Sequence, residues 1–201
     1  MDVLFIGMPL RCWDDEEEQR NRELDMAAIR ALSLQGWRVH AVNADLAEAG
    51  TVPYGTDSRF IQFGCHIPDQ DFLEDDVYWE DYSLLYISSA VAGYGSEYDD
   101  HVCRCAELAG QNGLFVCADM RGPASQAPWL GSSSILWSDT DNHVSLEGSC
   151  KIALNIQTDA VQLTTVRESF VFPGTGQPET FLARFLEKLL QGETLETAAA
   201  T

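Results

Sequence analysis

The sequence has few basic residues. Lysine and arginine together number 12 against 32 aspartates and glutamates, so the formal net charge of the 201-residue chain is −20. A surface this acidic repels phosphate backbones and anionic lipid headgroups, which disfavours binding to nucleic acids and membrane surfaces. We therefore expect neither nucleic acid nor membrane among the partners. The partner that the charge favours is a basic protein.

Long hydrophobic runs and paired-cysteine motifs are also missing. The apolar run from Val3 to Leu10 is short and contains Gly7 and Pro9, so it predicts neither a signal peptide nor a membrane span. The six cysteines include no C-x-x-C pair, and scattered thiols are typical of a reducing compartment. The sequence contains no G-x-S-x-G elbow, no phosphate-binding P-loop and no G-x-G-x-x-G fingerprint. We predict a cytoplasmic protein.

What is present is the composition of an ordinary globular protein. Hydrophobic residues make up 45% of the chain and charged residues 22%. A chain of this length can bury one sizeable core but is short for two domains. We therefore expect a single domain that spans residues 1–201.

Strand and helix patterns alternate along the chain. A buried strand is predicted over Asp2–Gly7, and the charged stretch 14–23 is expected to be solvated and to lead to a helix that ends at Gly36. A second strand runs from Trp37 to Val42, which is typical of a β-α-β unit in a parallel sheet. Further strands are predicted at 60–63, 83–88, 113–117, 134–137, 151–156, 160–165 and 169–172, with helices near 97–109 and 142–147. The order predicts an α/β protein with a mainly parallel sheet.

The most informative stretch is P-G-T-G-Q-P-E-T-F, from Pro173 to Phe181. It opens into an amphipathic helix whose apolar positions are Phe181, Leu182, Phe185, Leu186, Leu189 and Leu190. A glycine-rich turn before a helix is typical of anion binding, because free N–H groups and the positive end of the helix dipole point the same way. Here, however, Pro178 has no N–H to donate and Glu179 adds a negative charge.

This stretch resembles the C-terminal signature of the ribokinase-like (phosphofructokinase-B type) carbohydrate and nucleoside kinases, G-T-G-A-G-D-T-F. In that family the Gly-Ala-Gly backbone forms the anion hole for the transferred phosphate, and the aspartate is the catalytic base. The retained positions are Gly174, Thr175, Gly176, Thr180 and Phe181. The replaced positions are Gln177 for the alanine, Pro178 for the second glycine and Glu179 for the aspartate.

Weaker matches extend the resemblance over most of the chain. The segment from Phe115 to Trp129 is similar to the family's Asp-x-Asn-x-Arg…Trp stretch. The family's Asn-x-x-Glu motif, which organises magnesium and phosphate, corresponds to Ser138-Asp-Thr-Asp141, so Asp141 is the candidate metal residue. The stretch between Val42 and Ser83 is short for the family's lid strands. The resemblance thus implies a three-layer ribokinase-like (Rossmann-like) fold with helices on both faces of the sheet and the lid absent or reduced.

Several of these residues have two interpretations. Glu179 is either a degenerate catalytic base or a carboxylate that complements the helix dipole. Asp119 and Arg121 form either a phosphate clamp or an ion pair with each other. Asp141 either helps to hold Mg²⁺ or belongs to a polar turn after a strand.

Because so many of the family's working positions are altered together, the resemblance implies a pseudokinase. We expect a catalytically inactive protein for interaction, regulation or assembly, which needs no cofactor and binds a protein partner or a second copy of itself. The candidate contact residues are Asp14, Asp15, Glu16, Glu17, Glu18, Asp75 and Asp76. The alternatives are a minimal small-molecule kinase that uses ATP and Mg²⁺ with Glu179 as base, and a nucleotide or metabolite sensor without catalysis.

Overall fold

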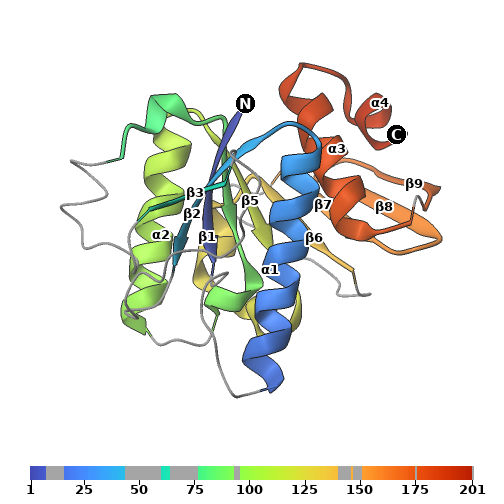
Figure 1. Ribbon diagram of the computed structural model, residues 1–201. Coiled ribbons are helices and arrows are strands. Elements are labelled where there is room, and N and C mark those ends of the chain that lie inside the picture. Colours follow the sequence, from blue (N-terminus) through green and yellow to red (C-terminus); the bar gives the residue numbers. More distant parts are fainter. Residues whose placement is uncertain are drawn as a thin grey trace.

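The computed structural model describes residues 1–7, 16–43, 60–63, 77–92, 96–139, 146, 151–174 and 176–200. Within these ranges nine strands form one sheet in the order β3-β2-β1-β4-β5-β6-β7-β8-β9 (Figure 1). Neighbouring strands from β3 to β7 are parallel, and β8 and β9 are antiparallel to their neighbours. The bounds are β1 (Asp2–Gly7), β2 (Arg38–Asn43), β3 (Phe60–Phe63), β4 (Leu84–Ile87), β5 (Phe115–Asp119), β6 (Ile135–Ser138), β7 (Ile152–Ile156), β8 (Ala160–Thr165) and β9 (Ser169–Pro173).

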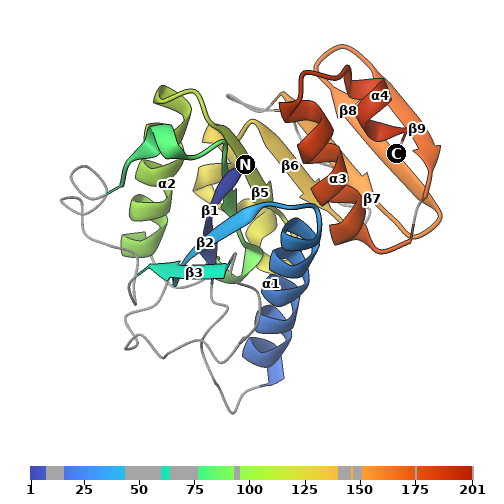
Figure 2. The same ribbon diagram turned by 45° about the horizontal axis from the view of Figure 1, so that its top comes forward.

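Helices cover both faces of this sheet. On one face, α1 (Glu16–Leu34) packs against α3 (Pro178–Leu190), and the short α4 (Leu195–Ala199) packs against α3. On the other face, α2 (Ser96–Gln111) packs against the 3₁₀ segment Pro128–Ser132. The views in Figures 1 and 2 show α1 and α3 on one side of the sheet and α2 on the other. The prediction of an α/β fold with a mainly parallel sheet between two helical layers is confirmed.

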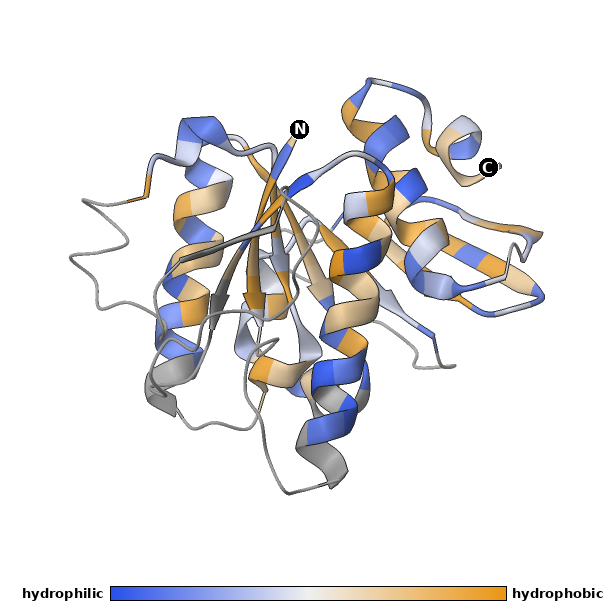
Figure 3. Cartoon of the chain, viewed as in Figure 1, coloured by the Kyte–Doolittle hydropathy of each residue, from blue (hydrophilic) through white to orange (hydrophobic). Residues whose placement is uncertain are grey.

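The central strands are hydrophobic because both of their faces are buried. All six residues of β1 are buried, as are the four residues L-L-Y-I of β4. Near-continuous apolar runs of this kind are typical of parallel sheets covered on both faces. Figure 3 shows these hydrophobic strands between helices that alternate hydrophobic and hydrophilic residues.

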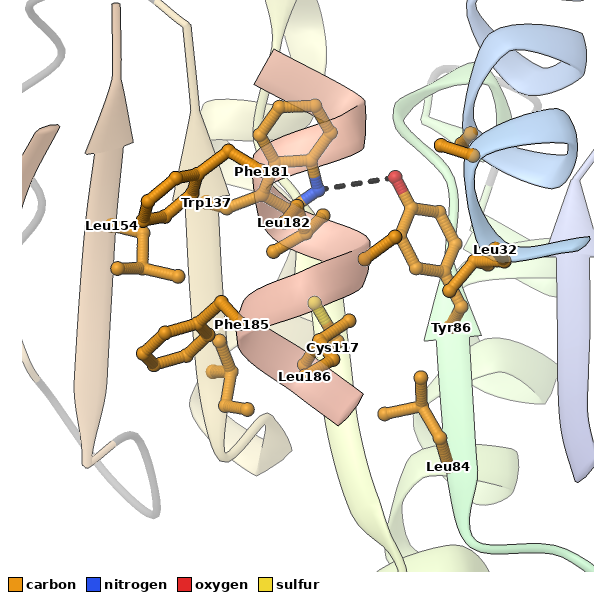
Figure 4. Close-up of a cluster of buried hydrophobic side chains, with 14 of the residues drawn as sticks. Leu32, Leu84, Tyr86, Cys117, Trp137, Leu154, Phe181, Leu182, Phe185 and Leu186 are labelled. Carbon is orange, nitrogen blue, oxygen red and sulfur yellow. Dashed lines mark hydrogen bonds between the residues drawn. The ribbon is translucent and has the colours of Figure 1, made fainter. Parts of the chain in front are cut away.

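The core beneath α3 combines aromatic and aliphatic side chains. The inward positions Phe181, Leu182, Phe185 and Leu186 are each at most 2% exposed, in agreement with the predicted apolar spacing. They pack on side chains from β4 to β7, which Figure 4 shows together with Leu32 of α1. Burial of each large apolar side chain contributes about 1.5–3 kcal/mol, so this contact holds the start of α3 in place over the sheet.

Two sequence predictions differ from the structure or fall outside it. The charged stretch 14–23 was expected to be a solvated segment leading to a helix, but residues 16–23 are already part of α1. The expectation was wrong because glutamate, glutamine and arginine are good helix formers and need no apolar face in the first turns. Of the predicted helix near 142–147, the structure describes only Leu146, which is not in a helix. Among the described helices, none combines the length and the apolar composition that crossing a membrane requires.

Candidate functional site

The carboxyl ends of the central strands meet the first turn of α3. Strand β5 ends at Asp119 and is followed by Arg121, while β6 ends at Ser138 and is followed by Asp139. Helix α3 begins at Pro178 and brings Glu179 to the same place. In open α/β sheets, ligands bind at the carboxyl ends of the strands. This junction is therefore the candidate site.

Arg121 is the centre of the site and binds three carboxylates. Its Nε donates to both Asp119 oxygens at 3.0 Å, and its Nη2 donates to Asp119 Oδ2 at 2.7 Å. Its Nη1 donates to Glu179 Oε1 at 2.7 Å and lies 3.7 Å from Asp139 Oδ2. The ion pair between Asp119 and Arg121, which was one of the two sequence interpretations, is confirmed.

Aromatic side chains pack against one face of the Arg121 guanidinium. The guanidinium carbon lies 4.2 Å from the centre of the Trp137 ring, within the range of a cation–π contact. The Trp137 indole N–H donates to the Tyr86 hydroxyl at 3.1 Å (Figure 4), and Tyr86 stacks on Phe5 with ring centres 4.8 Å apart. Burial raises the pKa of Tyr86 well above its ordinary value, so the hydroxyl stays protonated. These contacts leave Arg121 little freedom to move.

The site is negatively charged even though an arginine lies at its centre. Burial acts to lower the pKa of Arg121. The negative charge of Asp119 and the hydrogen bond to Glu179 act more strongly in the other direction and raise this pKa, so Arg121 is always charged. Burial also raises the pKa of Asp119 against the opposing effect of Arg121. Asp119, Asp139 and Glu179 thus place three acidic side chains around one arginine.

Few backbone donors remain at the start of α3. Pro178 is the first helical residue and has no N–H, while the N–H groups of Thr180 and Phe181 both donate to the carbonyl of Gln177, at 3.1 and 3.2 Å. The first turn therefore offers an anion at most the N–H of Glu179, whose own carboxylate is negative. Of the three positions that the resemblance assigns to the anion hole, Pro178 has therefore lost its backbone donor.

The two retained glycines have local structural roles. The Gly174 N–H donates to the Asp159 carbonyl at 2.8 Å, and a methyl group at this position would collide with the Thr158 carbonyl oxygen. Gly176 is exposed and has a φ of +100°, a conformation that glycine adopts without strain. Gly174 extends the pairing of β9 with β8 at the end away from their turn, and Gly176 lies in the connection from β9 to α3.

The described residues bring together only part of the predicted site. Glu179 and Gln177 lie at the start of α3 as expected, next to Gly174 and Gly176. Six other predicted positions lie outside the described residues: Thr175, Asp141, Asp14, Asp15, Asp75 and Asp76. Glu16, Glu17 and Glu18 lie in the first turn of α1, and their side chains are not described. Within the described ranges, no group of three or more histidines, cysteines or acidic residues could hold a metal ion.

Sequence reasoning missed a second polar contact, between α1 and β4. The Asp25 carboxylate is 2% exposed and accepts a hydrogen bond from the Ser88 hydroxyl, which also accepts from the Ala90 N–H at 3.0 Å. The available signal was the spacing of Asp25 with Ala28 and Leu32, which puts the carboxylate on the buried side of α1. The contact ties α1 to the carboxyl end of β4.

No protein-family model matches the chain, and no curated protein matches it either. Among solved structures it is similar to a probable sugar kinase protein from Rhizobium etli CFN 42, with a TM-score of 0.66 and 14% identity over 98% of this chain and 89% of that one. It is also similar to the tetrameric inhibited form of phosphofructokinase-2 from Escherichia coli, with a TM-score of 0.60 and 9% identity over 98% and 90% of the two chains. The chain has the ribokinase-like fold.

A third similar structure is adenosine kinase from Schistosoma mansoni in complex with tubercidin, with a TM-score of 0.58 and 11% identity over 98% of this chain and 91% of that one. The solved structures with this fold thus include kinases for sugars, a sugar phosphate and a nucleoside. At identities this low the likeness extends to the fold, and the chemistry has to be argued from the residues themselves.

Proposed function

We propose that this protein is a ribokinase-like pseudokinase that acts in protein interaction, regulation or assembly and uses no cofactor. The observation that carries the proposal is the hydrogen bond between Arg121 Nη1 and Glu179 Oε1 at 2.7 Å. Glu179 stands where the resemblance puts the catalytic base. Its carboxylate is 15% exposed and one of its oxygens already accepts a hydrogen bond from Arg121, which supports the proposal that it is not a working base.

The neighbouring groups favour the same conclusion. Removal of one donor that stabilises a developing oxyanion costs roughly 3–4 kcal/mol in transition-state stabilisation, and Pro178 removes such a donor from the first turn of α3. The three acidic side chains around Arg121 outnumber the one basic group, which opposes the approach of a triphosphate. Loss of donors and an excess of negative charge act together against phosphoryl transfer.

The proposal is tested by phosphoryl transfer from Mg²⁺–ATP to a panel of sugars and nucleosides. We expect no product above the level of an enzyme-free control. The matched variants are Glu179→Gln, which removes the carboxylate of the base position, and Glu187→Gln, which removes a carboxylate on the outer face of the same helix. Product formation that Glu187→Gln retains and Glu179→Gln abolishes would refute the proposal.

The second candidate is a minimal kinase that uses ATP and Mg²⁺. It is favoured by the carboxylate of Glu179 at the base position, one methylene longer than the family's aspartate. A displacement of the base by about 1 Å can cost on the order of 100-fold in rate, so the activity of such a kinase would be weak. Product formation that Glu187→Gln retains and Glu179→Gln abolishes would identify this candidate. Thermal stabilisation by nucleotide without turnover would instead identify a sensor.

A further inference from the structure

Strand β9 forms one edge of the sheet, as Figure 2 shows. One hydrogen bond of 2.8 Å lies at each end of its pairing with β8. The Thr165 N–H donates to the Glu168 carbonyl at one end, and the Gly174 N–H donates to the Asp159 carbonyl at the other. Backbone groups of an antiparallel strand alternate in direction. The N–H and C=O of Phe170 and Phe172 therefore face β8, and those of Val171 point out of the sheet.

The edge carries no charged side chain, although the whole chain has a net charge of −20. Val171 is 72% exposed, on the face of the sheet away from α3. Phe170 and Phe172 are partly buried against the α3 core, with their ring centres 6.3 Å apart. Natural edge strands are usually protected by lysines, other charges or bulges. Only Pro173, at the last position, provides such protection in β9.

The sequence S-F-V-F-P of β9 is almost symmetric about Val171. If two copies pair antiparallel around a twofold axis at this residue, each Val171 N–H donates to the Val171 carbonyl of the other copy. The same register places Phe170 opposite Phe172 of the second copy, which assembles four aromatic rings on one face. Cross-strand aromatic pairs of this kind stabilise sheets. Ser169 lies opposite Pro173 of the second copy. Proline has no backbone N–H, so no donor is left without a partner at this position.

We propose that the protein forms a twofold dimer in which β9 pairs with β9 of a second copy. The inference deepens the proposed assembly role and names its partner, which is another copy of this chain. The match is self-complementary, as an interface with twofold symmetry must be. The strand carries no carboxylate, and the register puts Glu168 opposite Gly174, so the pairing sets no two acidic side chains directly opposite each other.

The test is the mass of the full chain in solution, measured by light scattering after size exclusion. We expect about twice the chain mass of 22.3 kDa. Val171→Lys places two like charges across the axis and should give a monomer. Gln162→Lys is the matched control, because it adds the same charge at an exposed position of the adjacent strand β8 and should remain dimeric. Circular dichroism melts show whether each variant is folded.

Cross-linking gives an independent readout of the register. Directly opposed residues in a hydrogen-bonded antiparallel pair have Cα atoms about 5.5 Å apart, which a disulfide can span. Val171→Cys should therefore form a disulfide dimer under mild oxidation, and Gln162→Cys should not. A monomeric wild-type chain, or a dimer that survives Val171→Lys and is not captured by Val171→Cys, would overturn the proposal. None of these readouts depends on phosphoryl transfer, so the two proposals fail separately.

Discussion

At the scale of single residues, Arg121 is the group on which the candidate site depends. It is 6% exposed at its side chain and compensates the charge of Asp119, which is 2% exposed. Loss of one partner from a buried ion pair strands the other charge in a medium that solvates it poorly, at a cost of about 3–5 kcal/mol. The geometry therefore makes a strong prediction about stability as well as about chemistry.

We predict that Arg121→Met lowers the free energy of unfolding by about 3–5 kcal/mol, measured by urea denaturation. The double variant Asp119→Asn/Arg121→Met should recover a large part of this loss, because the stranded carboxylate is gone. Arg184→Met is the matched control, since Arg184 is exposed on α3. A loss at Arg121 no greater than that of the control would mean that the ion pair does not hold the site together.

His40 gives the molecule a pH dependence near neutrality. Its Nδ1 lies 2.9 Å from the Tyr82 hydroxyl, and burial lowers the pKa of His40 below its ordinary value of 6.5. The unfolded chain therefore binds a proton at a higher pH than the folded chain does. Stability contributed by the neutral ring is present above about pH 6.5 and is lost as the pH falls toward the lower folded pKa.

We predict that the denaturation midpoint falls between about pH 7.5 and about pH 5 in the wild-type chain, and that the fall is smaller in His40→Gln. Thermal melts of both proteins across this range measure the difference. The interval lies above the ordinary pKa of carboxylates, and Asp119, whose pKa burial raises, is the same in both proteins, so the difference between them reports on His40. Parallel curves for the two proteins would rule out His40 as the cause.

At the scale of the elements, the hairpin of β8 and β9 depends on close approach at Gly174. A methyl group there would collide with backbone atoms of Thr158 and Asp159, which cannot rotate out of the way. We predict that Gly174→Ala lowers the free energy of unfolding by about 1–3 kcal/mol. Gly131→Ala should change it little, because a methyl group at Gly131 meets no atom within 4 Å. Equal effects of the two substitutions in chemical denaturation would refute this account of the hairpin.

The elements were largely predictable from the sequence because local patterns specify them. Apolar runs mark the buried strands, and the strand predicted at 60–63 has the same bounds as β3. The apolar spacing of α3 identified its buried face in advance. The start of α1 was placed too late, because its first turns are charged and show no hydrophobic period.

The candidate site was predictable only in part. The motif resemblance pointed to the start of α3, and the pairing of Asp119 with Arg121 was one of two interpretations of neighbouring residues. The contact between Arg121 and Glu179 joins residues 58 positions apart, and no local pattern encodes it. The same applies to Asp25 and Ser88, which are 63 positions apart. Such contacts follow from how the sheet brings its strand ends together, which a single sequence does not show.

At the scale of the whole molecule, the chain has the ribokinase-like fold, and the proposed association with protein would use an edge of its sheet. The sheet and both helical layers are present, and the solved structures with this fold include sugar and nucleoside kinases. The site at the carboxyl ends of the strands is closed by an internal ion pair. An uncharged, self-complementary strand meanwhile lies at one edge. The fold is thus shown by similarity, and the proposed function lies at the edge of its sheet.

The most direct test of the central claim is isothermal titration of the purified chain with Mg²⁺–ATP and with ADP in moderate salt. We predict no detectable binding at millimolar nucleotide, because the start of α3 offers few donors and the three carboxylates around Arg121 repel phosphate. Binding in the micromolar range would contradict the claim and show that this site still accepts a nucleotide.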